Sequence, residues 1–185
     1  CLTMQTVTIT EPTALSLSVN TPAIICINQS ATISATASGG TGPYTYSWSD
    51  GNTTSSEIVT PTVTTSYDVT VTDANGCTAA LQTVTVNVYP ALSVNASAPA
   101  SVCENETATF TSTAGGGNGG PYTYLWSNGT TTSSTTQTVT QSTTLIVSLD
   151  DGCSPPVQDT VTVLLNPLPV VDFTPLTSNG CSPVT

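Results

Sequence analysis

Residues 42–51 read Gly-Pro-Tyr-Thr-Tyr-Ser-Trp-Ser-Asp-Gly, and residues 120–129 read Gly-Pro-Tyr-Thr-Tyr-Leu-Trp-Ser-Asn-Gly. Up to the Trp, aromatic residues alternate with mostly small or polar ones, which is the period of a β-strand with one buried face. Each copy ends in Asp-Gly or Asn-Gly, dipeptides that suit the positive φ angles of a tight hairpin turn. The two copies therefore predict one strand and one turn that occur twice in the chain.

The same alternation continues outside this stretch. Residues 67–72 and 83–88 place Val or Tyr on one face and mainly Thr on the other, and residues 145–149 and 161–163 repeat the pattern. The chain contains 40 Thr and 22 Ser, and Thr and Val both favour strands. A disordered linker or a mucin-like stalk is the alternative for such a composition. Neither has a reason to keep the alternation, so the sequence predicts an all-β protein.

The charge balance excludes several classes of function. The chain has no Lys, Arg or His, and its formal net charge is −11. Without cations it has no electrostatic footprint for nucleic acid or anionic lipid, and without His or Lys it lacks the usual general bases. A pair of carboxylates could still act in hydrolysis, but units this small are not expected to form a deep cleft. We therefore expect no enzyme activity, no cofactor, no nucleic-acid partner and no membrane insertion.

The cysteines reveal the period of the repeat. Two interleaved series have nearly the same spacing: Cys1, Cys77 and Cys153 are 76 residues apart, and Cys26, Cys103 and Cys181 are 77 and 78 apart. Such self-similarity is typical of a tandem array. The predicted organisation is the last strand of a preceding repeat over 1–12, complete repeats over 13–90 and 91–167, and the first strand of a following repeat over 168–185.

The order of Cys, Trp and Cys within a unit suggests a fold. Cys26 precedes and Cys77 follows the strand that carries Trp48, which is the order found in immunoglobulin-like β-sandwiches. The absence of His and of a Cys-x-x-Cys pair disfavours zinc. We therefore expect tandem immunoglobulin-like sandwiches with one internal disulfide each, in an oxidising, extracellular location. The predicted bonds are Cys26–Cys77 and Cys103–Cys153, with Cys1 and Cys181 paired outside the segment.

The aromatic residues and the acidic residues each allow two interpretations. Trp48, Trp126, Tyr46 and Tyr124 could form a sugar-stacking surface, but the sandwich requires the Trp in its core and the alternation puts both Tyr on the same face. We predict that these four are core residues. Asp73, Asp150 and Asp151 lie near the ends of units, where calcium could bind, and calcium prefers oxygen ligands. The alternative, which we favour, is that these residues cap turns through the backbone.

Both complete units resemble the immunoglobulin-like and PKD-like repeats of very large surface proteins of the Bacteroidota, including SprB-type gliding adhesins. The similar residues are the stretch at 42–51, Thr-Thr-Ser-Tyr-Asp-Val-Thr-Val-Thr-Asp-Ala-Asn-Gly-Cys at 64–77, the strand at 83–86 and the PKD-like opening at 171–185. The resemblance implies type IX secretion, a cell-surface location and repeats that act as spacers or build filaments. It also makes Thr160 a glycosylation candidate, because Asp159-Thr160-Val161 is similar to an O-glycosylation motif of these bacteria.

These observations lead to a structural expectation. The segment should act as a disulfide-stapled rod or stalk in an adhesin or filament, with neighbouring repeats or identical chains as its partners. The alternative is a module that binds a surface glycan or a host protein through the loops at 39–43 and 115–121. Those two loops differ in length and sequence, which disfavours one shared ligand.

Overall fold

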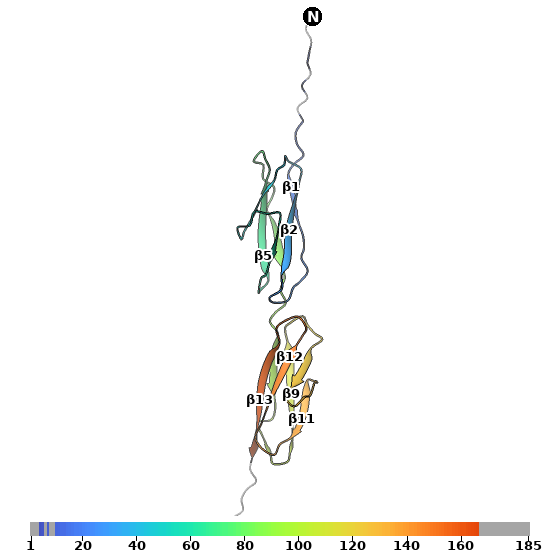
Figure 1. Ribbon diagram of the computed structural model, residues 1–185, viewed down its shortest axis with the longest axis vertical. Coiled ribbons are helices and arrows are strands. Elements are labelled where there is room, and N and C mark those ends of the chain that lie inside the picture. The colour runs from blue at the N-terminus through green and yellow to red at the C-terminus, as the bar shows by residue number, and fades with distance from the viewer. Residues whose placement is uncertain (1–3, 6, 8–9, 167–185) are drawn as a thin grey trace, which may run out of the picture.

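The computed structural model of the chain describes residues 4–5, 7 and 10–166. Two β-sandwiches lie end to end along the long axis of the molecule (Figure 1). The described residues contain no helix, and hence none long and apolar enough to cross a membrane. The prediction of an all-β fold is confirmed.

The first sandwich consists of two antiparallel three-stranded sheets, ordered β1-β2-β4 and β3-β5-β6. Its strands are β1 (Ser16–Val19), β2 (Ala31–Ser38), β3 (Thr45–Trp48), β4 (Ser56–Val59), β5 (Thr65–Thr72) and β6 (Gln82–Val86). Between β1 and β2, Ile25 forms a parallel bridge with Val88. Val88 lies at the exit end of the unit, where the chain passes on to the second sandwich, so Ile25 lies at that end too.

The second sandwich repeats this plan with one more strand. Its sheets are ordered β7-β9-β11 and β10-β12-β13-β8, with β8 parallel to β13. Its strands are β7 (Ser93–Ser97), β8 (Ser101–Cys103), β9 (Thr107–Gly115), β10 (Thr123–Trp126), β11 (Ser134–Thr138), β12 (Thr143–Asp150) and β13 (Val157–Asn166). Strand pairing in the described part of the chain therefore separates residues 16–88 from residues 93–166.

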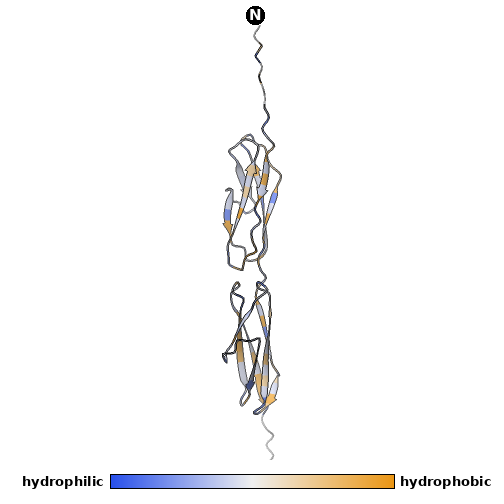
Figure 2. Cartoon of the chain, turned by 90° about the vertical axis from the view of Figure 1, so that its right-hand side faces the viewer, coloured by the Kyte–Doolittle hydropathy of each residue, from blue (hydrophilic) through white to orange (hydrophobic). Residues whose placement is uncertain are grey.

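Alternation along the strands builds a separate core in each unit. Orange, hydrophobic segments are interspersed with pale and blue ones along the strands of both units (Figure 2). Trp48 and Trp126 lie in the two cores, and each indole Nε1 donates a hydrogen bond to a backbone carbonyl, at 2.8 and 2.9 Å. Tyr46 and Tyr124 are half-buried and pack against the same clusters. Phe110 meets Trp126 edge to face, a geometry that aromatic pairs prefer.

The predicted end segments have different outcomes. The residues among 1–12 that the structure describes lie in no strand. The strand expected over 168–185 lies outside the described residues, as does Cys181. The structure therefore describes the two central units and the joint between them.

Candidate functional site: the joint between the sandwiches

A disulfide crosses the joint between the two units. Cys26 directly follows Ile25 at the exit end of the first sandwich, and Cys153 lies in the loop between β12 and β13 at the facing end of the second. The two cysteines are bonded, with 5.5 Å between their Cα atoms and a sequence separation of 127. That Cα separation is typical of protein disulfides. The bond therefore connects one unit covalently to the next, beside the linker.

The predicted pairing of Cys26 with Cys77 and of Cys103 with Cys153 is wrong, as is the prediction of one internal disulfide per unit. The two cysteines of a unit lie at opposite ends of its sandwich. In the first unit, the eight residues of β5 separate these ends, and a strand of that length spans roughly 26 Å. A disulfide requires Cα atoms within about 7 Å. The two cysteines of one unit are therefore too far apart to bond to each other.

The sequence contains a signal that could have revealed this. In an immunoglobulin domain the bridge joins the two sheets through the core. Here Cys26 lies five residues before β2 begins, and Cys77 lies five residues after β5 ends. Neither cysteine belongs to the alternating pattern of a strand. Cysteines in end loops can only meet a partner at the same end of the sandwich.

A buried carboxylate holds the loop that presents Cys153. Asp151 Oδ1 accepts hydrogen bonds from the backbone N–H groups of Cys153 at 3.0 Å and Ser154 at 2.6 Å. Its Oδ2 accepts one from the N–H of Asn118 at 2.8 Å. Burial alone would raise the pKa of Asp151, but these N–H donors outweigh it and lower the pKa below its ordinary value. The ionised carboxylate thus ties the cysteine loop to the loop before β10.

Asp73 has the same role in the first unit. Its Oδ1 accepts from the N–H groups of Cys77 at 2.8 Å and Asn75 at 2.9 Å, and its Oδ2 accepts from the N–H of Thr41 at 3.0 Å. The hydrogen bonds from the Thr41 and Cys77 backbone lower the pKa of Asp73, and burial opposes them only in part. Both units therefore present a loop cysteine from an acid-centred turn.

The glycine-rich loops support these carboxylates. Gly117 has a φ of 60°, and a Cβ atom at this position would collide with the Asp151 carboxylate. Gly40 has a φ of 61°, and a Cβ atom there would lie 2.7 Å from Asp73 Oδ2, which is also closer than real Cβ contacts. Only Gly combines positive φ with so close a contact. The loops at 39–43 and 115–121, which the sequence suggested as binding loops, thus pack against the acid that orders each cysteine loop.

The calcium candidates do not form a ligand set in the described structure. Within residues 4–5, 7 and 10–166, no three His, Cys, Asp or Glu side chains gather closely enough to hold a metal ion. Backbone N–H groups occupy the oxygens of Asp73 and Asp151, and Asp150 Oδ1 accepts from the N–H of Gly152 at 2.7 Å. These contacts match the turn-capping interpretation. Calcium binding stays a prediction.

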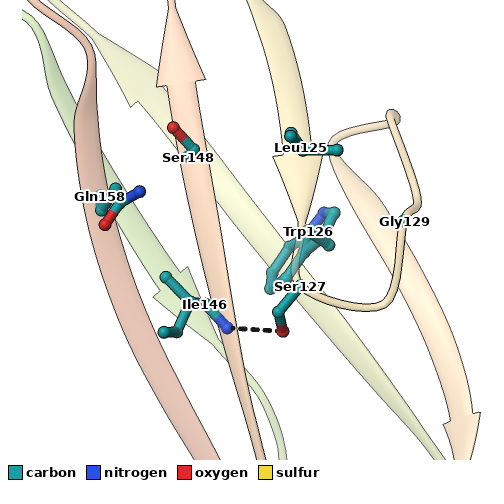
Figure 3. Close-up of a pocket in the computed structure, with 7 residues that line it drawn as sticks. All are labelled: Leu125, Trp126, Ser127, Gly129, Ile146, Ser148 and Gln158. Carbon is teal, nitrogen blue, oxygen red and sulfur yellow. Dashed lines mark hydrogen bonds between the residues drawn. The ribbon is translucent and has the colours of Figure 1, made fainter.

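An open depression on the second unit is the other candidate surface (Figure 3). Leu125, Ile146 and Gln158 line it above the edge of Trp126, and Ser127 Oγ accepts a hydrogen bond from the Ile146 N–H at 3.2 Å. The first unit has a matching depression. Its lining, however, is Ser47, Trp48, Ser49, Asp68, Thr70 and Leu81. Leu125 and Ile146 of the second unit thus correspond to Ser47 and Asp68 of the first, so the two depressions differ in their ligand chemistry.

The glycosylation candidate Thr160 lies in the middle of β13. It is exposed and pairs with Ile146 across the sheet. The preceding Asp159 side chain accepts a hydrogen bond from the N–H of Ala96 at 2.7 Å. The acid of the motif is therefore engaged in the sandwich, whereas the Thr side chain faces outward. Glycosylation of Thr160 stays a prediction.

Several solved structures are similar to the chain at low identity. The three N-terminal domains of the bacteriophage RB49 outer capsid protein Hoc share 20% identity over 82% of this chain and 59% of theirs, with a TM-score of 0.46. An I-band fragment of titin shares 12% over 86% of this chain and 67% of its own, with a TM-score of 0.48. The D00-D0 domain of Intimin shares 14% over 80% and 99%, with a TM-score of 0.44. No curated protein matches the chain.

The family comparison concerns the first unit. The SprB repeat family matches residues 19–53, from the end of β1 to the turn after Trp48. This stretch includes Cys26 and the repeated sequence at 42–51, which contains β3. The match covers less than one third of the chain, so it assigns that part of the first unit. Residues 19–53 match the SprB repeat family, and the resemblance to SprB-type immunoglobulin-like repeats that the sequence predicted is confirmed there.

Proposed function

We propose that this segment is a load-bearing spacer in an adhesin or filament on the outer surface of a bacterial cell. The observation that carries the proposal is the bond between Cys26 and Cys153 across the joint of two sandwiches arranged end to end (Figure 1). Its partners are neighbouring repeats or identical chains, and its role needs no catalytic group. An extracellular location would keep such a bond oxidised.

The bond changes the path that a pulling force takes. When the two ends of the segment are pulled apart, the force reaches Cys26, crosses the disulfide and continues from Cys153. The stretch between them, residues 27–152, lies outside this covalent path. That stretch contains most of both cores, including Trp48 and Trp126. Even if a sandwich unfolds under load, this part of the chain cannot be pulled straight.

The joint also restricts bending. The linker between the units is Tyr89-Pro90-Ala91, and Pro fixes its own φ angle and lacks a backbone donor. Within the described residues, no hydrogen bond joins residues 16–88 to residues 93–166. The linker and the disulfide are the two covalent connections between the described units, and two connections at one joint allow less rotation than one.

The alternative function, a glycan- or protein-binding module, has weaker support. A ligand common to the repeats would need a surface common to both units, and the matching depressions differ between Leu125 and Ser47 and between Ile146 and Asp68. By contrast, the acid-centred cysteine loop is present in both units. The feature that the two units share is thus the cysteine loop at the joint rather than a binding face.

Single-molecule force spectroscopy of the oxidised chain, held by its two ends, tests the proposal. The Cys26→Ser variant should extend further than the parent by roughly 430 Å, because 127 residues at about 3.4 Å each are released into the force path. The matched control is Cys103→Ser, which removes an exposed cysteine that is unpaired in the described structure and should extend like the parent. Equal extension of all three chains would overturn the load-bearing role.

A further inference from the structure

Cys77 and Cys103 lie at the two outer ends of the pair of sandwiches. Both are exposed and unpaired in the described part of the chain, whereas the bonded Cys26 and Cys153 are half-buried. We infer that Cys103 and Cys77 are the two halves of further joints of the same kind, each bonded to a cysteine of another repeat. Cys103 bonds to the cysteine of a following unit that corresponds to Cys153, and Cys77 bonds to the cysteine of a preceding unit that corresponds to Cys26.

The backbone presents Cys103 as it presents Cys26. In both places the residue before the cysteine pairs in parallel with the C-terminal end of its unit: Ile25 forms a bridge with Val88, two residues after β6, and Val102 pairs with Leu165 of β13. In both, the N–H of the third residue after the cysteine donates to the cysteine carbonyl, at 3.0 and 3.2 Å. Asn28 and Asn105 occupy the same turn position, each with a φ of 68°. A cysteine held in the geometry of the bonded Cys26 is therefore available at the far end of the second unit.

The loop at Cys77 matches the loop at Cys153 in the same way. The carboxylate of Asp73 accepts the N–H of Cys77 at 2.8 Å, and that of Asp151 accepts the N–H of Cys153 at 3.0 Å. In both loops a Gly with positive φ directly precedes the cysteine. The first loop is two residues longer, but the anchoring contact is unchanged. The two outer ends therefore present the same two local structures that meet in the observed joint, the Cys26 type at Cys103 and the Cys153 type at Cys77.

The observed bond joins unlike ends, which sets the polarity of any further joint. A contact between two different ends of the same kind of unit is head-to-tail, and such contacts generate open rods rather than closed dimers. Each bond forms when two thiols lose two protons and two electrons. The electrons pass by two exchange steps to a disulfide-carrying oxidoreductase or to oxidised glutathione, which leaves as two thiols.

Disulfide mapping of the intact protein from its own cells tests the inference. The protein is alkylated without reductant and digested with pepsin. Cys77 and Cys103 should escape alkylation, and the Cys103 peptide should be linked to a peptide with a Gly-Cys loop from another repeat. A non-reducing gel shows whether that repeat belongs to the same polypeptide or to a second copy. Alkylation of either cysteine, or a Cys103–Cys103 link, would overturn the inference.

A second measurement tests the polarity directly. In the 185-residue chain with Cys1→Ser and Cys181→Ser, the further variants Cys77→Ser and Cys103→Ser are mixed in a glutathione redox buffer. A mixed dimer contains a bond between Cys103 of one chain and Cys77 of the other. Its yield should exceed the yield of either homodimer by at least about tenfold, which corresponds to a docking preference of about 1.4 kcal/mol. Yields in the statistical ratio of random thiol oxidation would overturn it. The inference rests on the bond between Cys26 and Cys153. Its test stays distinguishable from that of the load-bearing role, because the dimer yields report on Cys77 and Cys103 whereas the extension reports on Cys26.

Discussion

At the scale of single residues, a buried carboxylate decides how each loop cysteine is presented. Asp151 is 6% exposed and accepts three backbone hydrogen bonds from two different loops. A carboxylate that satisfies several N–H groups is hard to replace, because its loss leaves buried donors without partners. The sequence predicted a turn-capping role for Asp73 and Asp151. It did not reveal that Asp151 also ties the cysteine loop to the Gly-rich loop, because that contact joins Asp151 to Asn118, 33 residues away in sequence.

The change Asp151→Ala tests this role. It should lower the free energy of unfolding of the second unit by about 2–3 kcal/mol, since it removes hydrogen bonds to a charged group and leaves buried N–H groups unpaired. Urea unfolding measures the loss. The neighbouring Asp150→Ala, which removes one hydrogen bond to Gly152, is the control and should cost far less. Equal losses would mean that Asp151 does not anchor the loop.

Acid should weaken the fold through the same carboxylates. Asp73, Asp151 and Asp159 all have pKa values below the ordinary one. A depressed pKa contributes stability that is present above the unfolded value, about 3.9, and disappears as the pH falls through the folded value. Burial raises the pKa of Glu57, which acts in the opposite direction. We expect urea midpoints to be nearly level from neutral pH down to about pH 4 and to drop below it.

The chain with Asp73→Asn and Asp151→Asn provides the comparison for this pH series. It lacks two of the three carboxyl groups whose pKa is depressed, so its urea midpoint should change less between pH 4 and pH 2 than that of the parent. An equally steep drop in both chains would show that other groups cause the acid sensitivity.

At the scale of secondary-structure elements, alternation predicted six of the 13 described strands, β3, β5, β6, β10, β12 and β13, but not the connections between their ends. The alternating residues 44–48, 67–72 and 83–88 correspond to β3, β5 and β6, and their buried positions include Trp48, Val69 and Val84. A period of two says which face a side chain occupies. It does not say which end of the sandwich a loop residue reaches. The disulfide prediction failed for that reason.

Core packing in β9 offers a test at this scale. Phe110 is fully buried against Trp126, so Phe110→Ala should cost about 3–5 kcal/mol. The exposed neighbour Thr109→Ala should change stability by at most about 0.5 kcal/mol. Unfolding followed by fluorescence measures both, and the Trp48 signal of the first unit should keep its midpoint in the reduced chain. A similar loss for both variants would contradict the assigned face of β9.

At the scale of the whole molecule, each sandwich has its own core, and the disulfide belongs to neither core. Reduction should therefore leave both units folded while it loosens the joint. Circular dichroism should stay unchanged. The distribution of distances between two labels, one in each unit, should widen on reduction and in the Cys26→Ser chain. An unchanged distribution would mean that the linker alone fixes the joint.

The central claim is the bond between Cys26 and Cys153, and a disulfide map of the oxidised chain tests it most directly. The chain has no Lys or Arg, so pepsin replaces trypsin, and the unreduced peptides are identified by mass spectrometry. We predict a linked pair of peptides that contain Cys26 and Cys153. Linked pairs of Cys26 with Cys77 and of Cys103 with Cys153 would contradict the account, because each disulfide would then stabilise one unit and none would cross the joint.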